Sequence, residues 1–142
     1  MKRTCLSVVI MSLAVLALTA TGHAGTIIVE VTGIKQGSGN IAISLFNSAD
    51  TFPTHGKGYK SASIPVTGKE VVHTFSDIPS GEYALAVYHD VNGNKEFDRN
   101  ILGIPQEDYA FSNNASSPFG PPRYEKAKFV LEDTYTARIT LQ

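Results

Sequence analysis

The sequence predicts an all-β protein, a single antiparallel β-sandwich of about seven strands with one long ordered loop. Apolar and polar residues alternate with a period of two in six runs, which is the pattern of strands with one buried face. Gly and Pro residues separate these runs, and no amphipathic helix pattern appears after residue 24. Together these observations favour two packed sheets around one core.

The strands can be placed from the same alternation. Residues 26–33 and 40–47 flank a Gly-rich connection and are expected to form an antiparallel hairpin. Residues 61–66 predict a short edge strand, because Pro65 lacks the amide proton that an inner strand must donate. The other predicted strands cover residues 70–78, 83–90, 125–131 and 134–142.

A Greek-key arrangement of the immunoglobulin-like or transthyretin-like kind is expected. Gly81 and Tyr83 follow a Pro-containing turn, as in the tyrosine corner of Greek-key sandwiches. Twelve residues on the apolar faces form the predicted core: Ile27, Val29, Ile41, Ile43, Leu45, Phe75, Tyr83, Leu85, Val87, Phe129, Ile139 and Leu141.

The first 24 residues read as a cleavable secretory signal peptide. Lys2 and Arg3 precede an apolar run over residues 6–18, and small residues lead to an expected cleavage site after Ala24. The run is shorter than the ~20 residues of a membrane span, so no span is expected in the mature chain. Residues 25–142 would then form one domain that is periplasmic or secreted.

Composition narrows the partners of that mature domain. The only cysteine, Cys5, leaves with the signal peptide, so no disulfide or thiolate ligand is expected. Without Lys2 and Arg3 the domain has 10 basic and 13 acidic residues, a net charge of −3. This balance argues against nucleic acid and against an anionic membrane surface. The expected partner is an unidentified protein or small ligand of the cell envelope.

The stretch HDVNGNKEFD, residues 89–98, predicts a weak calcium site. Asp90, Asn92 and Asn94 hold alternate positions of a calcium loop, followed by the backbone carbonyl of Glu96 and the carboxylate of Asp98. Calcium takes 6–8 oxygen ligands, which suits such a run of oxygen-bearing groups.

The stretch departs from the EF-hand pattern in two ways. Lys95 replaces the glycine of the sharp turn, and Ile101 replaces the glutamate that closes the shell. Asn100, Glu107 and Asp108 are candidates for the missing ligand. The alternative interpretation is that Asn92-Gly93 is a plain hairpin turn with solvated carboxylates beside it.

Residues 89–124 form the predicted long loop, which is far longer than the usual connection of ~4–6 residues. We expect it to be ordered and functional, held by the apolar side chains of Ile101, Leu102, Ile104, Phe111 and Phe119. Tyr109, Phe111, Phe119 and Tyr124, with Arg123, are a candidate binding patch or, more simply, further anchors of the loop.

No complete catalytic constellation is visible, so a non-catalytic binding or structural module is preferred over an enzyme. A periplasmic hydrolase that uses the long loop is the alternative, with Ser112 or the Ser116-Ser117 pair as candidate nucleophiles. His55, His73 and His89 lack the spacing of metal ligands, so no transition-metal site is predicted.

The motifs GEYA, HD-x-N-x-N and GIP-x-E-x-YAFSNN, with the later PFGPPRYEKAKFVL, resemble an exported bacterial family known as domain of unknown function 2141. The resemblance covers essentially the whole mature chain and implies an exported β-sandwich with no established activity. More distantly, residues 77–87 are similar to transthyretin-like, carboxypeptidase-regulatory modules, which are more often binding domains than enzymes.

Overall fold

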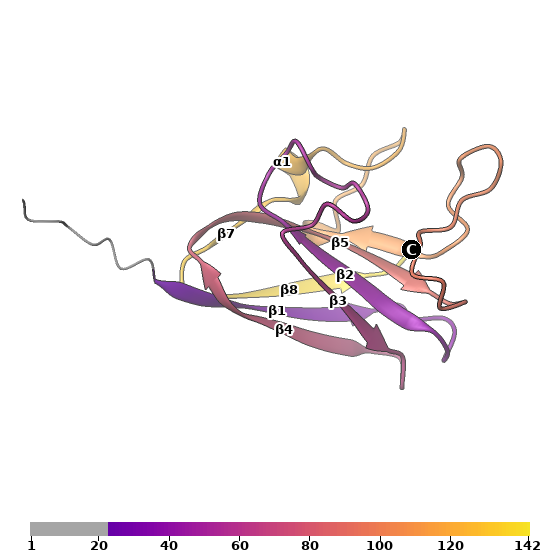
Figure 1. Cartoon of the computed structure of the whole chain (residues 1–142), viewed down its shortest axis with the longest axis horizontal. Coiled ribbons are helices and arrows are strands. Elements are labelled where there is room, and N and C mark those ends of the chain that lie inside the picture. The colour runs from indigo at the N-terminus through magenta and orange to yellow at the C-terminus, as the bar shows by residue number, and fades with distance from the viewer. Residues whose placement is uncertain (1–22) are drawn as a thin grey trace, which may run out of the picture.

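A computed structural model describes residues 23–142, so the predicted signal peptide lies outside the described residues up to position 22. The described chain is mostly β (Figure 1). Its strands are β1 (Ala24–Thr32), β2 (Asn40–Phe46), β3 (Lys60–Pro65), β4 (Val71–Pro79), β5 (Gly81–Asp90), β6 (Tyr109–Phe111), β7 (Phe129–Leu131) and β8 (Thr134–Thr140). Its two helical turns are η1 (Ser112–Asn114) and α1 (Tyr124–Ala127). No helix within residues 23–142 is long and apolar enough to cross a membrane.

The strands form two sheets. One has the order β4-β1-β8, and the other has the order β3-β2-β5-β6 with β7 also paired to β5. The inward faces of both sheets contribute to one buried cluster that contains all twelve predicted core residues, from Ile27 to Leu141. The period-two pattern therefore identified the core correctly, because each strand buries alternate residues.

The predicted hairpin of the first two strands is wrong, since β1 and β2 lie in different sheets. The seven-residue connection between them crosses the end of the core, where Ile34 is buried. Gly33 and Gly39 both have a φ of 78°, which lets the chain turn at each end of this crossing. A Gly-rich connection after an alternating strand is thus compatible with a change of sheet as well as with a hairpin.

The expectation of wholly antiparallel sheets also needs correction. β1 pairs antiparallel with β4 on one side and parallel with β8 on the other. β8 follows β7, which pairs with β5 in the other sheet. Because β8 is not joined to β1 by a hairpin turn, it can pair with β1 in either direction. The predicted strand over residues 125–131 is shorter than expected, because its first part forms α1.

A second apolar cluster covers the outward face of β5 near its start, formed by Phe46, Phe52, Ala84, Phe111, Tyr124 and Ala127. Asp90, which points away from the main core as predicted, is only 1% exposed at the other end of the strand, where its carboxylate accepts hydrogen bonds from three amides of the following loop. The expected tyrosine corner is also formed: Tyr83 donates its hydroxyl hydrogen to the Pro79 carbonyl oxygen at 2.8 Å.

The long connection is ordered, but its predicted anchors are mostly wrong. Only Phe111 is buried, whereas Ile101, Leu102, Ile104 and Phe119 are exposed. Residues 98–106 instead form a hairpin-like projection, here called the tongue, closed by the bonds from the Asn100 amide to the Ile104 carbonyl and from the Gln106 amide to the Asp98 carbonyl. Backbone hydrogen bonds rather than apolar burial give this segment its shape.

Candidate functional site

The predicted calcium loop begins at the end of β5, where Asp90 organises the backbone. Asp90 Oδ1 accepts hydrogen bonds from the amides of Gly93 (2.7 Å) and Asn94 (3.2 Å), and Oδ2 accepts one from Lys95 (2.9 Å). A carboxylate that accepts three backbone hydrogen bonds fixes the chain in a tight coil around it.

The next two alternate positions continue the coil. Asn92 Oδ1 accepts a hydrogen bond from the Asn94 amide at 3.0 Å, and Asn94 Oδ1 accepts one from the Glu96 amide at 2.9 Å. The side-chain NH₂ groups of both asparagines donate to the Asp98 carboxylate, at 2.7 to 3.1 Å. Asp90, Asn92, Asn94 and Asp98 are thereby gathered in one compact loop, while Glu96 takes part through its backbone.

Lys95 adopts the conformation that its position demands. Its φ is 65°, in the left-handed region that glycine enters at little cost. Lysine therefore takes up a left-handed conformation at the position where the calcium-loop pattern has glycine. The Asp90 carboxylate, which binds the Lys95 amide, holds the strained conformation in place.

Glu107 is the most unusual polar group of this region. The tongue folds back on itself and places Glu107 beside Asp98, whose amide donates to Glu107 Oε2 at 3.1 Å. The residue is 9% exposed, and its Oε1 is buried without a hydrogen-bond partner. Burial raises the pKa of Glu107, the nearby carboxylates of Asp98 and Asp90 raise it further, and the amides of Asp98 and Val91 oppose the rise. An unpartnered buried carboxylate oxygen is costly unless a further group binds it.

The two other candidates for the missing ligand are already engaged. Asn100 Oδ1 accepts hydrogen bonds from the amides of Leu102 and Ile104, and Asp108 pairs with Lys35 at 2.9 Å. Within residues 23–142, no three His, Cys, Asp or Glu side chains lie together as a metal cluster. Any cation shell would thus need Asn oxygens and a backbone carbonyl in addition to carboxylates.

A large apolar cleft lies next to this loop and was not predicted from the sequence. Its volume is about 730 Å³. Its floor is the outward face of β2, β5 and β6, and its walls come from residues 53–55, from residues 97–105 and from residues 118–121. Several separate short segments form the cleft, so no single run of residues in the sequence predicts it.

Aromatic rings make an unbroken path along the cleft. Tyr88 lies between His55 (ring centroids 5.9 Å apart) and Phe97 (5.4 Å), and Tyr109 lies between Phe97 (5.6 Å) and Phe111 (5.8 Å). Burial and the carboxylates behind it, Asp90 first, raise the pKa of Tyr88 to about 12. Tyr88 therefore keeps its hydroxyl proton at all physiological pH values.

The family model described as an uncharacterized protein conserved in bacteria (DUF2141) matches residues 29–138. The chain belongs to the DUF2141 family. No curated protein and no solved structure matches the chain.

The candidate nucleophile Ser112 has a structural role in this DUF2141 domain. Its side chain is fully buried, accepts a hydrogen bond from the Leu85 amide at 2.9 Å and donates one to the Ala127 carbonyl at 2.5 Å. Both contacts tie η1 to neighbouring elements. A hydroxyl committed in this way is not free to attack a substrate.

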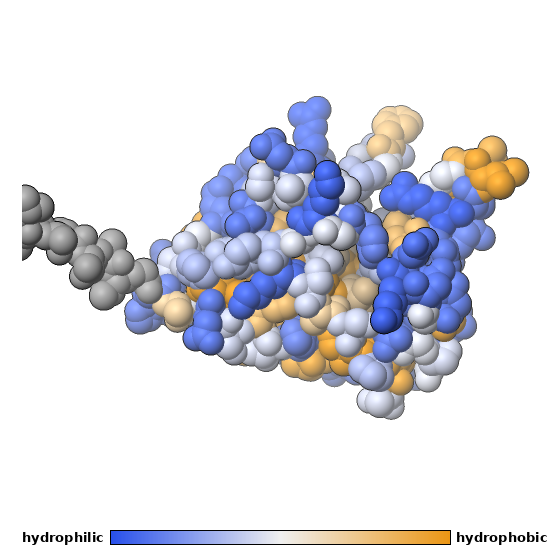
Figure 2. All heavy atoms as spheres, in the orientation of Figure 1, coloured by the Kyte–Doolittle hydropathy of each residue, from blue (hydrophilic) through white to orange (hydrophobic). Residues whose placement is uncertain are grey.

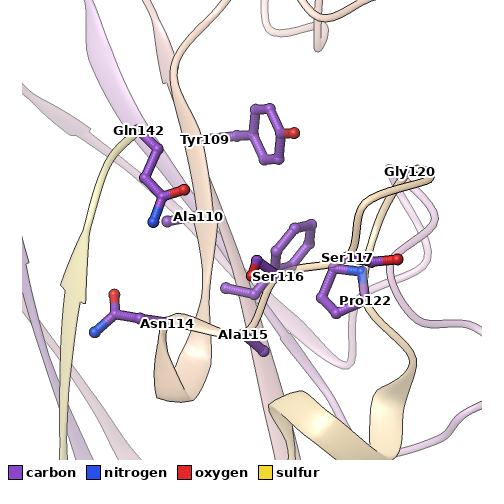
Figure 3. A pocket seen from close by; sticks show the side chains of 10 residues that line it. Tyr109, Ala110, Asn114, Ala115, Ser116, Ser117, Gly120, Pro122 and Gln142 are labelled. Carbon is purple, nitrogen blue, oxygen red and sulfur yellow. The ribbon is translucent and has the colours of Figure 1, made fainter.

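Ser116 and Ser117 line a second, smaller cavity of about 110 Å³. Figure 3 shows its side chains coming from β6, from residues 114–122 and from the C-terminal Gln142. Tyr109 is the only titratable side chain among the ten residues that line it. Among the side chains that line this cavity, the phenol of Tyr109 is therefore the only potential acid or base for these serines.

The three histidines serve separate structural contacts in the DUF2141 domain. His89 Nε2 lies 2.7 Å from the Ser38 carbonyl oxygen, which joins the end of β5 to the β1–β2 connection. This contact joins two segments that are 51 positions apart in the sequence. His55 packs against Tyr88, and His73 packs against Phe75 with ring centroids 4.6 Å apart.

Proposed function

We propose that this protein is an exported, non-catalytic binding module whose calcium-binding loop shapes an apolar ligand cleft. One observation carries the proposal: the segment that contains the candidate cation ligands continues directly into a wall of the cleft. Phe97, which lies between Glu96 and Asp98, contacts Tyr88 and Tyr109 inside the cleft. A cation at the loop would therefore fix the shape of a binding surface.

The proposed calcium ligands are Asp90, Asn92, Asn94, the carbonyl of Glu96 and Asp98. The first three side chains already coil the chain through hydrogen bonds to backbone amides. Asp90 Oδ2, Asn92 Oδ1 and Asn94 Oδ1 each accept one hydrogen bond and keep a second lone pair that a cation could use, whereas Asp90 Oδ1 already accepts two. Calcium would also offset the repulsion between Asp90 and Asp98.

Glu107 is proposed as the ligand that closes the shell, in the role that the sequence leaves open at Ile101. Its buried, unpartnered Oε1 is the independent support for a cation here. The nearby carboxylates of Asp98 and Asp90 disfavour the charge of Glu107, and a divalent cation would compensate both this repulsion and the burial. With few carboxylates the site should be weak, with a Kd of about 10⁻⁴–10⁻³ M.

Thermal unfolding in the presence of calcium tests the site. Protein treated with chelator should gain about 1.4 kcal/mol of stability at a calcium concentration ten times Kd. For a domain of this size the gain corresponds to an increase in Tm of about 3–6 °C. Glu107→Gln, which keeps the shape and removes the charge, should lose most of the increase, and Asp98→Asn should reduce it.

Asp108→Asn is the matched control, because Asp108 is adjacent in sequence but pairs with Lys35. It should keep the full calcium effect. An identical Tm of the wild-type protein with and without 10 mM calcium, about ten times the weakest expected Kd, would remove the site and favour the plain hairpin turn.

Export is the second part of the proposal, and it rests on the charged start, apolar run and small residues of positions 1–24. Mass spectrometry of the natively expressed protein should find a mature chain that begins at Gly25. A chain that retains Met1 would contradict export through a cleaved signal.

We further propose that the two sheets form a Greek-key sandwich of the immunoglobulin-like or transthyretin-like kind. The tyrosine-corner hydrogen bond from Tyr83 to Pro79 and the crossing of the chain between sheets after β1 support this assignment. An experimental structure superposed on both kinds of domain tests it.

A further inference from the structure

The cleft has a simple charge pattern. Arg99 is the only Lys or Arg among the residues that line it, and no Asp or Glu lines it. The guanidinium of Arg99 lies over the ring of Phe97, 5.1 Å from its centroid. In the described part of the chain, Arg99 forms no ion pair, although Lys35, Lys128 and Arg138 all do. The cleft thus combines an apolar floor with one cation that is available to a ligand.

Two apolar projections extend beyond the cleft. Ile101 and Leu102 occupy the corner of the turn that the Gly103 amide closes by donating to the Asn100 carbonyl at 2.9 Å. Ile101 is fully exposed and Leu102 is 77% exposed. Turn corners usually hold polar residues, Gly or Pro, so two large apolar side chains on an ordered turn call for a function.

The second projection carries Phe119, which is 94% exposed. Its neighbours Pro118, Gly120 and Pro121 line the cleft, as do Gly103 and Ile104 of the tongue. Figure 2 shows apolar side chains at the ends of two projections on the same side of the molecule. Both tips therefore border the same cleft and lengthen its apolar surface.

We propose that the cleft binds a monomeric single-chain amphiphile with an anionic head, of the fatty acid class. The apolar chain would lie along the rings of Tyr88, Phe97 and Tyr109 and reach the exposed tips. The head would pair with Arg99, because a guanidinium binds a carboxylate through two parallel hydrogen bonds. A volume of about 730 Å³ is within the usual range of ligand sites. This inference rests on the proposed binding role and names its ligand.

Calorimetric titration with dodecanoate, kept monomeric and in chelator-containing buffer, tests the proposal. The wild-type protein should bind it, and Arg99→Gln should weaken binding by about ten-fold or more, since hydrogen bonds to charged groups are the strong ones. Arg123→Gln is the matched control, because Arg123 is exposed but does not line the cleft. Dodecanol should bind more weakly, and Arg99→Gln should not change its affinity.

A separate pair of variants tests whether the exposed tip of the tongue contributes to binding. Leu102→Ser should weaken binding of dodecanoate more than binding of the shorter hexanoate, because only the longer chain reaches Leu102 at the tip of the tongue. Val130→Ser, which removes an exposed apolar side chain from β7, should affect neither ligand.

Three results would overturn the proposal: no binding of dodecanoate by the wild-type protein, equal effects of Arg99→Gln and Arg123→Gln, or binding to phosphatidylcholine vesicles without binding of the monomer. The third result would assign the tips to a bilayer surface. Because calcium is absent from this assay, failure here is separate from failure of the calcium site. A calcium-dependent Tm without dodecanoate binding would refute only the ligand class.

Discussion

At the scale of the residue, Lys95 has a backbone conformation that favours glycine. A lysine with a φ of 65° destabilises the folded state by about 1 kcal/mol relative to glycine. Part of the gain from a glycine is offset, because glycine has greater conformational freedom in the unfolded chain. We expect Lys95→Gly to raise Tm by about 2–4 °C in chelator-containing buffer.

Lys95→Gln is the control for that prediction, because it removes the charge and keeps the strained backbone. It should not raise Tm in chelator. If both variants raise Tm equally, the effect comes from the charge and not from the backbone, and Lys95 is not strained as its φ indicates.

At the scale of the element, β5 begins with a hydrogen bond that can be removed cleanly. Tyr83 donates to the Pro79 carbonyl at 2.8 Å from a side chain that is 4% exposed. Tyr83→Phe keeps the packed ring and removes the bond, so we expect a loss of about 0.5–1.5 kcal/mol in chemical denaturation. Tyr135→Phe, which removes a more exposed 3.3 Å bond to Asn113, should cost less. A larger loss for Tyr135→Phe would contradict the importance of the corner.

The strands and the core could be predicted from the sequence because alternation is a local signal. β4 and β5 were placed nearly to the residue, since Phe75, Leu85 and Val87 alternate with polar or small neighbours. The pairing of the strands was harder to predict from the sequence. Nothing in the sequence around Gly33 and Gly39 separates a hairpin from a crossing between sheets, and the parallel pairing of β1 with β8 joins residues about 108 positions apart.

The candidate site was predictable only in part, for a related reason. Asp90, Asn92, Asn94 and Asp98 are close in sequence, so their gathering could be predicted, whereas Glu107 reaches them only because the tongue folds back. The pattern Asn100-x-x-Gly103, with Asn first and Gly last in a turn, was the available signal for the tongue. It would have shown that Ile101 and Leu102 are exposed turn corners and not anchors.

At the scale of the whole molecule, the proposed ion site and the cleft share one short segment. Glu96 and Asp98 are proposed ligands of the ion, while Phe97 and Arg99, between and after them, line the cleft. An ion that fixes the first pair also orders the second pair. Such a coupling is reciprocal, so a ligand in the cleft should strengthen ion binding as much as the ion strengthens ligand binding.

The fluorescent anion 1-anilinonaphthalene-8-sulfonate can measure this coupling, because it combines apolar rings with one sulfonate and stays soluble with calcium. We expect 10 mM calcium to lower its Kd by about five-fold, which corresponds to a coupling of about 1 kcal/mol. Phe97→Ala should weaken binding of the dye and make its Kd independent of calcium, since the variant removes the side chain that links the two sites. Phe119→Ala should weaken binding of the dye and keep the calcium dependence, because Phe119 belongs to the other loop, whose residues Pro118 and Gly120 line the cleft. An unchanged Kd with calcium would mean that the loop and the cleft act independently, even if each binds its own partner.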